Sequence, residues 1–282
     1  MQEGVSRRHF LATAVSVSAA SQLPLIAQSQ QGGGRRNREV DSEKKALPVV
    51  EKRVEKVFMA PGEHPNALQA MDDGLWILDQ ADPNKAHKVR YADGSVLVEI
   101  QTESMHGSGI TYGNDALWIA STSSLENCKS CLKTLKVDPK TGKTLAYFNT
   151  PGAVERRFAR PGRRPGQAPR PGGAHGLEWA DGKYWIAVPP SIMIYQVQPE
   201  TGEVVHSIPA PGARPHGLAW ENGRLWCVES NDRAVYKMDP KTGDLLAKIV
   251  LTENDPVPHG LTIKDGVLWY CDADSRWVCR LV

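Results

Sequence analysis

Five segments of the chain share one alternation of apolar and polar residues. Each segment has 14 residues, with an apolar residue at its third place, a polar turn at its centre and an apolar–Trp pair at places ten and eleven. The first reads NALQAMDDGLWILD (66–79), the fourth reads HGLAWENGRLWCVE (216–229), and the others lie at 108–121, 175–188 and 259–272. Each segment therefore predicts two antiparallel strands joined by a tight turn.

A second turn follows most of these segments. It reads VDPKTG at 137–142, VQPETG at 197–202 and MDPKTG at 238–243, and the first unit has RYADGS at 90–95. With a further strand on each side of this turn, the unit becomes a four-stranded meander of about 40 residues, the size of a propeller blade. The sequence therefore predicts an all-β fold, a five-bladed β-propeller of four-stranded blades.

The two ends of the chain are predicted to close the ring. The fifth unit stops at SRWVCRLV, its third strand, and so lacks an outermost strand. We expect residues 53–59 to supply that strand, so that no long edge is left free. Six blades are the main alternative, but the interval between His106 and His175 reads as two loops without a further Trp-bearing unit.

Composition and charge narrow the class of protein. The 282 residues are 40% hydrophobic and 23% charged, which is typical of one sizeable globular domain. The net charge of +2 does not indicate a nucleic-acid binder. The sequence contains no phosphate-cradling Gly loop, nucleophile elbow or recognisable Ser-His-Asp arrangement.

The first 28 residues read as an export signal. Arg7 and Arg8 precede a moderately apolar stretch of small residues, a pattern that resembles a twin-arginine signal peptide. The stretch is too short, and too broken by Ser, Gln and Pro24, to span a bilayer. We expect a signal at 1–28, a flexible linker at 29–50 and the propeller at 51–282, with the twin-arginine machinery as export partner and a periplasmic or secreted location.

The first position of the repeat predicts a ring of polar residues. Because innermost strands line the central channel of a propeller, equivalent positions in successive blades meet around it. The ring has five members: Asn66, Ser108, His175, His216 and His259. A hairpin turn at Asn222–Gly223 and its equivalents would place His216 opposite Glu229 and His259 opposite Asp272.

Three imidazoles on adjacent blades suggest a metal site. Neutral imidazole is a common ligand of borderline divalent metals. We expect a divalent ion of unknown identity on His175, His216 and His259, with Glu229 and Asp272 as further ligands or as groups that orient the imidazoles. The alternative is that His-Gly-Leu simply starts a blade, with the Gly permitting a close approach at the axis.

The roles within this site are predicted as follows. His216 and His259 are the candidate catalytic groups, because either imidazole could move a proton. The other ring members and the basic residues near the mouth are candidate substrate-binding residues. They are Asn66, Ser108, His64, His106, Arg156 and Arg157.

Two insertions add chemistry to the repeats. Segment 151–173 holds six arginines, including Arg156 and Arg157, and could form a cationic lid that attracts a small anionic ligand. The alternative is a solvated Pro-Gly-Arg loop. Cys128 and Cys131 have C-x-x-C spacing, for which a local disulfide is the leading interpretation, ahead of a redox or metal role.

The repeated tryptophans are expected to be core residues, because a large ring at one position of each second strand packs blade against blade. They are Trp76, Trp118, Trp185, Trp226 and Trp269. Cys227, Cys271 and Cys279 lie in strands and read as small buried apolar residues, or as one pair with a single thiol.

The fourth unit, RPHGLAWENGRLWCVESNDRAVYKMDPKTGDLLAKI, carries a resemblance to known propellers. It resembles a blade of the streptogramin B (virginiamycin B) lyase-like family and, more distantly, of gluconolactonase-like propellers. In the lyase family a His at the start of an inner strand acts with a metal-binding Glu at the end of the next strand, and His216 and Glu229 stand in matching places. That lyase has seven blades, whereas five-bladed organisation resembles the plant-type glutaminyl cyclases.

Two hypotheses about function follow. The first is a metal-assisted lyase or hydrolase, and the second is a non-catalytic periplasmic propeller that binds a ligand or a protein. We expect a small-molecule partner and no nucleic acid.

Overall fold

The computed structural model describes Met1, residues 42–155 and residues 172–282. The propeller lies within one compact unit, Lys44–Val282. Contacts of this unit start before the predicted boundary at 51, since the Val50 N–H donates to the Lys248 carbonyl oxygen at 2.8 Å. Among the described residues, no helix has the length and apolar character needed to cross a membrane.

Five sheets of four antiparallel strands form the blades. Blade one contains β2 (Pro65–Met71), β3 (Gly74–Asp79), β4 (Lys85–Val89) and β5 (Val96–Gln101). Blade two contains β6 (Gly107–Gly113), β7 (Ala116–Ser121), β8 (Lys133–Val137) and β9 (Thr144–Asn149). Blade three contains β10 (Gly176–Ala180), β11 (Lys183–Val188), β12 (Met193–Val197) and β13 (Val204–Pro209), with the short 3₁₀ helix η2 (Pro189–Ser191) before β12. Blade four contains β14 (Pro215–Glu221), β15 (Arg224–Glu229), β16 (Ala234–Met238) and β17 (Leu245–Val250).

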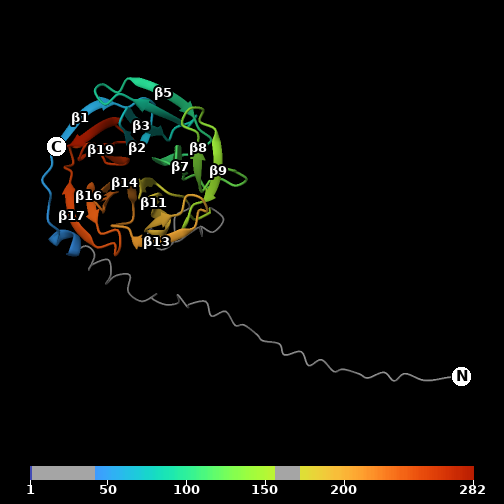
Figure 1. Cartoon of the computed structure of the whole chain (residues 1–282). Helices are drawn as coiled ribbons and strands as arrows, with labels where there is room; N and C mark the ends of the chain where they lie inside the picture. Colours follow the sequence, from blue (N-terminus) through green and yellow to red (C-terminus); the bar gives the residue numbers. More distant parts are fainter. Residues whose placement is uncertain (2–41, 156–171) are drawn as a thin grey trace. The chain divides into compact units, whose positions relative to one another are not determined.

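Blade five is built from both ends of the propeller, as predicted. Strands β18 (Leu261–Lys264), β19 (Val267–Cys271) and β20 (Trp277–Leu281) are completed by β1 (Val54–Met59), which pairs antiparallel with β20 from Val54↔Leu281 to Met59↔Trp277. An ion pair of 2.8 Å between Arg280 and Glu55 lies across this junction. The fold is a five-bladed β-propeller, and the six-bladed alternative is excluded (Figure 1).

The predicted turn chemistry sets the inner hairpins. Asn222 and Gly223 both have positive φ, at 48° and 74°, and Asp265 and Gly266 repeat this at 50° and 76°. Two central residues with positive φ define the type I′ turn, whose twist matches that of the flanking strands. Each such turn therefore holds the innermost two strands of its blade in a fixed register.

The core lies between blades. Each of the five repeated tryptophans is at most 6% exposed. Trp185 of blade three packs with Leu218 and Leu225 of blade four, and Trp226 of blade four packs with Leu261 of blade five. The prediction that these rings pack blade against blade is confirmed, and the blades depend on one another for burial of apolar surface.

Glycine at the second repeat position lets the inner strands touch at the axis. The Gly217 N–H donates to the carbonyl oxygen of His259 at 2.8 Å, which joins blades four and five directly. A Cβ atom on Gly217 would lie 2.6 Å from that same oxygen and 2.7 Å from the carbonyl carbon of Gly260. Backbone atoms cannot yield as a side chain can, so this position requires glycine.

We predict that Gly217→Ala destabilises the domain by about 1–3 kcal/mol or more, because the added methyl group overpacks two backbones. The matched control is Ala67→Gly at the same repeat position of blade one, which should cost no more than about 1 kcal/mol. Urea unfolding of both variants measures the difference. Equal stabilities would show that the close approach at the axis is not required.

Candidate functional site

The structure brings the three predicted histidines together at the axis. The rings of His175 and His216 have centroids 4.5 Å apart, and those of His216 and His259 are 4.9 Å apart. His175 directly precedes β10, His216 is the second residue of β14, and His259 lies two residues before β18, so the three come from blades three, four and five. His216 is 1% exposed and His259 is 5% exposed, which places both in the interior of the cluster.

Asn66, Ser108 and His175 form a hydrogen-bonded chain that continues the ring. The amide of Asn66 donates to Ser108 Oγ at 2.9 Å, and Ser108 Oγ lies 3.1 Å from His175 Nδ1. His175 Nε2 lies 3.3 Å from the hydroxyl of Thr122. Both ring nitrogens of His175 therefore have hydroxyl partners, and all five predicted ring members belong to one polar cluster.

His216 differs from its neighbours because neither ring nitrogen bonds to a protein group. Nδ1 and Nε2 of His216 are both buried without a hydrogen-bond partner among the described residues, and so is Oδ1 of Asn66. Buried polar atoms are nearly always hydrogen-bonded, since leaving one unpaired costs roughly 1–3 kcal/mol. These three atoms therefore lack the hydrogen bonds that buried polar atoms normally make.

The tautomer of His259 follows from its partner. Its Nδ1 lies 3.2 Å from the carbonyl oxygen of Val257, which can only accept a hydrogen bond. Nδ1 must then carry the proton, so neutral His259 has its lone pair on Nε2. The Asp272 carboxylate lies 3.9 Å from the same Nδ1, and its charge supports this orientation.

All three imidazoles are held neutral. Burial, and to a smaller extent the positive charge of Arg214, lower the pKa of His175 from 6.5 to about 3. Burial likewise places the pKa of His216 well below its ordinary value and lowers that of His259. Although His175 is partly exposed, burial of its ring among protein atoms is the largest cause of the lowered pKa.

The predicted pairing of His216 with Glu229 is wrong. The register runs from Glu221↔Arg224 to Leu218↔Cys227 as expected, but a β-bulge then shifts it, and Pro215 pairs with Glu229. A bulge places two residues of one strand opposite one of the other, so it turns the side chain of His216 toward the axis and leaves the carboxylate behind. Glu229 Oε2 instead accepts the Arg214 N–H at 2.8 Å.

Equivalent side chains in other blades do the same. Asp79 accepts the N–H groups of Glu63 and His64, each at 2.8 Å. Asp272 accepts the Val257 N–H at 3.1 Å, and the Ser121 hydroxyl accepts the Met105 N–H at 3.0 Å. In blades one, two, four and five, the last place of the repeat therefore fixes the loop that enters the blade, a role that sequence reasoning did not assign, whereas blade three has Val188 there.

The donor set has limited room for a metal ion. His175 already uses both nitrogens, and Glu229 and Asp272 accept backbone N–H groups, which leaves His216 and Nε2 of His259 as open imidazole donors. In the described parts of the chain, no group of three or more His, Cys, Asp or Glu residues is arranged to hold a metal ion. The predicted five-residue metal site does not fit this arrangement, and a divalent ion stays a prediction.

A second set of side chains lies three residues further along the inner strands, where each joins neighbouring blades. Gln69 Oε1 accepts the Tyr112 N–H at 3.2 Å, and Thr262 Oγ1 accepts the Ala70 N–H at 3.0 Å. Glu178 occupies this position in blade three and accepts the Trp220 N–H, and burial raises its pKa from 4.5 to about 8. Glu178 is thus a buried carboxyl group at a position where blade one uses a neutral amide.

Of the predicted substrate-binding residues near the mouth, His64 and His106 enter the structure two residues before Asn66 and Ser108. His106 is exposed and His64 is partly exposed. The predicted lid residues Arg156 and Arg157 lie outside the described residues. The base of their insertion is closed by an antiparallel bridge between Val154 and Gly172.

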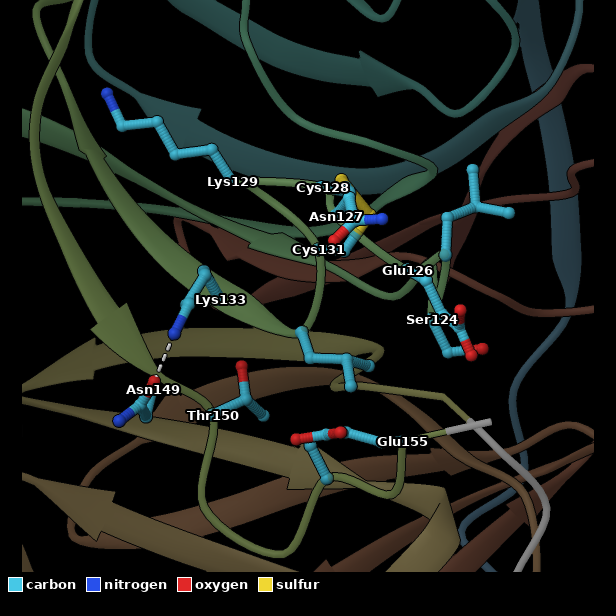
Figure 2. A pocket seen from close by; sticks show the side chains of 13 residues that line it. Ser124, Glu126, Asn127, Cys128, Lys129, Cys131, Lys133, Asn149, Thr150 and Glu155 are labelled. Atoms are coloured by element: carbon cyan, nitrogen blue, oxygen red, sulfur yellow. Dashed lines mark hydrogen bonds between the residues drawn. A yellow bond between two sulfur atoms is a disulfide. The ribbon is translucent and has the colours of Figure 1, made fainter. Parts of the chain in front are cut away.

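The predicted Cys128–Cys131 disulfide is present, with Cα atoms 5.4 Å apart, whereas Cys227, Cys271 and Cys279 are free and buried. The disulfide borders a hollow of about 850 Å³ (Figure 2). Its polar lining comes from blade two and the segment that follows it, and includes Lys133, which bonds to Asn149. No axial ring residue lines it, so we assign the candidate site to the axis, where both ring nitrogens of His216 and Oδ1 of Asn66 lack a partner among the described residues.

Three residues near the axis were missed by sequence reasoning: Thr122, Glu178 and Arg214. Thr122 comes directly after the 14-residue segment of blade two, and this position in the sequence does not by itself indicate a contact with His175. Arg214 has a clearer signal, because it precedes His216 by two residues just as His64 precedes Asn66.

Comparison with known proteins gives a fold. No protein-family model matches the chain, and no curated protein matches it. The glutaminyl cyclase of Myxococcus xanthus is similar in structure, with a TM-score of 0.62 and 10% identity over 83% of this chain and 97% of that chain. The likeness is one of fold. Virginiamycin B lyase from Staphylococcus aureus also matches, with 17% identity, 77% of this chain, 66% of that chain and a TM-score of 0.45, too low to carry an argument.

The pKa shifts predict a pH dependence of stability. His175 is neutral when folded but protonates near 6.5 when unfolded, so its share of stability is present above pH 6.5 and is lost as pH falls toward about 3. We predict that His175→Asn, which installs the blade-one residue, flattens the loss of unfolding free energy between neutral pH and about pH 5. Urea unfolding across this range measures it.

Glu178→Gln provides the control of opposite sign. The raised pKa of Glu178 stabilises the fold below pH 4.5, and this share is lost as pH rises through about 8. The Gln variant should therefore gain stability relative to the wild type as pH rises. Parallel pH profiles for the wild type and both variants would contradict the burial of these groups.

Proposed function

We propose that this propeller is an enzyme of the lyase or hydrolase class and that the axial cluster of His175, His216 and His259 is its active site. The observation that carries the proposal is His216, a buried imidazole that lies between two further imidazoles and has no partner for either nitrogen in the described part of the chain. Convergent polar groups with perturbed pKa values are a usual mark of an active site.

His259 has the features of a general base. Its Nδ1–H is fixed by the Val257 carbonyl oxygen and faces the Asp272 carboxylate, which leaves the Nε2 lone pair free to accept a proton. Its pKa is below 6.5, so the imidazole is in the basic form at neutral pH. A base oriented by a third group is the arrangement that proton abstraction or water activation requires.

His216 supplies the second proton-transfer group. A neutral imidazole has one donor and one acceptor nitrogen, and both are open in His216. It can therefore donate to a leaving group or to a carbonyl oxygen while His259 takes a proton. His175 is held by Ser108 and Thr122, so its part is to position His216, whose ring it contacts.

If a divalent ion takes part, the groups that would hold it are the two open donors, His216 and Nε2 of His259. When bound, such an ion would polarise a carbonyl group. We derive no step through it, because the carboxylates expected to complete its coordination accept backbone N–H groups.

Export is the second part of the proposal. The twin-arginine pattern at Arg7 and Arg8 lies outside the described residues, and it supports a periplasmic or secreted location through resemblance alone. The competing function, a propeller that binds a ligand without chemistry, would use the same axial cluster. Turnover separates the two functions.

We predict that His259→Ala lowers kcat by about a hundredfold or more on any ester, lactone or elimination substrate that the wild type turns over. The matched control is His206→Ala, whose imidazole lies on outer strand β13 and contacts the Lys241 carbonyl oxygen. In the wild type, kcat/KM should rise with pH through a value below 6.5 and then level off.

A panel of ester, lactone and elimination substrates, assayed with and without added divalent ions, measures these effects. Full activity in both His259→Ala and His216→Ala would contradict the proposal. A wild type that turns over no member of the panel would favour the binding function.

A further inference from the structure

Arg214 is held at the mouth of the channel by its backbone. Its N–H donates to Glu229 Oε2 at 2.8 Å, and its carbonyl oxygen accepts the Ser230 N–H at 3.3 Å. Pro215 follows and pairs with Glu229 at the bulge that turns His216 toward the axis. The main chain at Arg214 is therefore fixed on both sides, directly before the imidazole cluster.

The guanidinium group of Arg214 has no described protein partner. The residue is exposed, and no hydrogen bond or ion pair in the described ranges 42–155 and 172–282 engages its side chain. Its positive charge nevertheless acts on all three axial imidazoles and lowers the pKa of each. Arg214 thus combines electrostatic reach to the whole cluster with five unused N–H donors.

The loop residues that lead into the ring also lack negative charge. The residues two places before the five ring positions are His64, His106, Gly173, Arg214 and Val257, none of which is acidic. The acidic residues closest in the repeat are Asp79, Glu229 and Asp272, and each accepts a backbone N–H. Among the exposed acidic residues, Asp274 acts on His259, whereas the positive charge of Arg214 acts on all three imidazoles, so the net charge felt by the cluster favours an anionic ligand.

The axial cluster contains neutral groups that can form hydrogen bonds with a ligand, in addition to the nearby charge of Arg214. Nδ1 and Nε2 of His216 and Oδ1 of Asn66 are buried polar atoms that have no partner within residues 42–155 and 172–282. Because these groups are neutral, they suit an uncharged polar part of a ligand, whereas Arg214 suits an anionic part. The exposed charge of Arg214 and the neutral polar atoms of the buried ring are thus two features that one ligand with an anionic end and an uncharged polar end would match.

We propose that Arg214 anchors an oxyanion, a carboxylate or phosphate group, of a small substrate whose polar reacting end lies against His216 and His259. This inference rests on the proposed function and adds the substrate class to it. A guanidinium group binds a planar oxyanion through two parallel hydrogen bonds, which fixes orientation as well as position. Anchored in this way, the substrate presents its reacting atoms to His259 at a set depth in the channel.

The test is calorimetric titration of the purified mature protein with oxalate, with its neutral isostere oxamide and with inorganic phosphate, near neutral pH. The wild type should bind at least one of the two anions and bind oxamide more weakly than oxalate. Arg214→Gln should weaken anion binding by about tenfold to a hundredfold, the loss of one charge-assisted hydrogen-bonded contact. Arg214→Lys should be intermediate, because a point charge replaces the two-pronged contact.

Arg224→Gln is the matched control. Arg224 starts β15 at the inner hairpin turn and pairs with Asp239 at 3.6 Å, so its loss removes equal charge away from the ring. It should leave anion binding within about twofold of the wild type, while added salt weakens binding in both. Circular dichroism of each variant confirms the fold.

Three results would overturn the inference: anion binding by Arg214→Gln that equals the wild type, oxamide binding as tight as oxalate binding, or no binding of any probe. The titration needs no turnover, so its outcome is independent of catalysis. Arg214-dependent anion binding in a protein that turns over no substrate would support the anchor and contradict the proposed function.

Discussion

The contact on which the rest of this structure depends is the direct approach of inner-strand backbones around the axis. Gly217 of blade four bonds to the carbonyl oxygen of His259 in blade five with no side chain between them. That closeness fixes the five strand starts in a small circle, and in blades one, two and four a bulge beside it turns the ring residue inward. Three imidazoles become neighbours because three blades begin with His-Gly-Leu.

Crowding at the axis then sets the chemistry of the cluster. Protonation of the three imidazoles is unfavourable, because they are removed from water and because the charge of Arg214 repels a second positive charge. They therefore stay neutral at physiological pH. The hydroxyls of Ser108 and Thr122 satisfy His175, the Val257 carbonyl oxygen orients His259, and His216 keeps both nitrogens open. Differences between blades at single positions thus divide the roles among otherwise repeated residues.

Much of the fold was predictable from the sequence, because the spacing of the repeats indicates the number and order of the strands. The spacing of Trp76 and its equivalents gave the blades, and the missing strand after Trp277 gave the closure by residues 53–59. The bulge was not predictable, since simple pairing across Asn222–Gly223 assumes an unbroken ladder. Without the bulge, Glu229 was predicted opposite His216, whereas its carboxylate fixes the loop at Arg214.

The central claim, that the axial imidazoles are neutral and that His259 presents a free Nε2, is tested most directly by their tautomers. Long-range ¹H–¹⁵N correlation spectra of the isotope-labelled protein at neutral pH distinguish the protonated from the unprotonated nitrogen of each ring. The account predicts no imidazolium among His175, His216 and His259, and a proton on Nδ1 of His259. A charged ring in this trio at neutral pH, or a His259 protonated on Nε2, would contradict it.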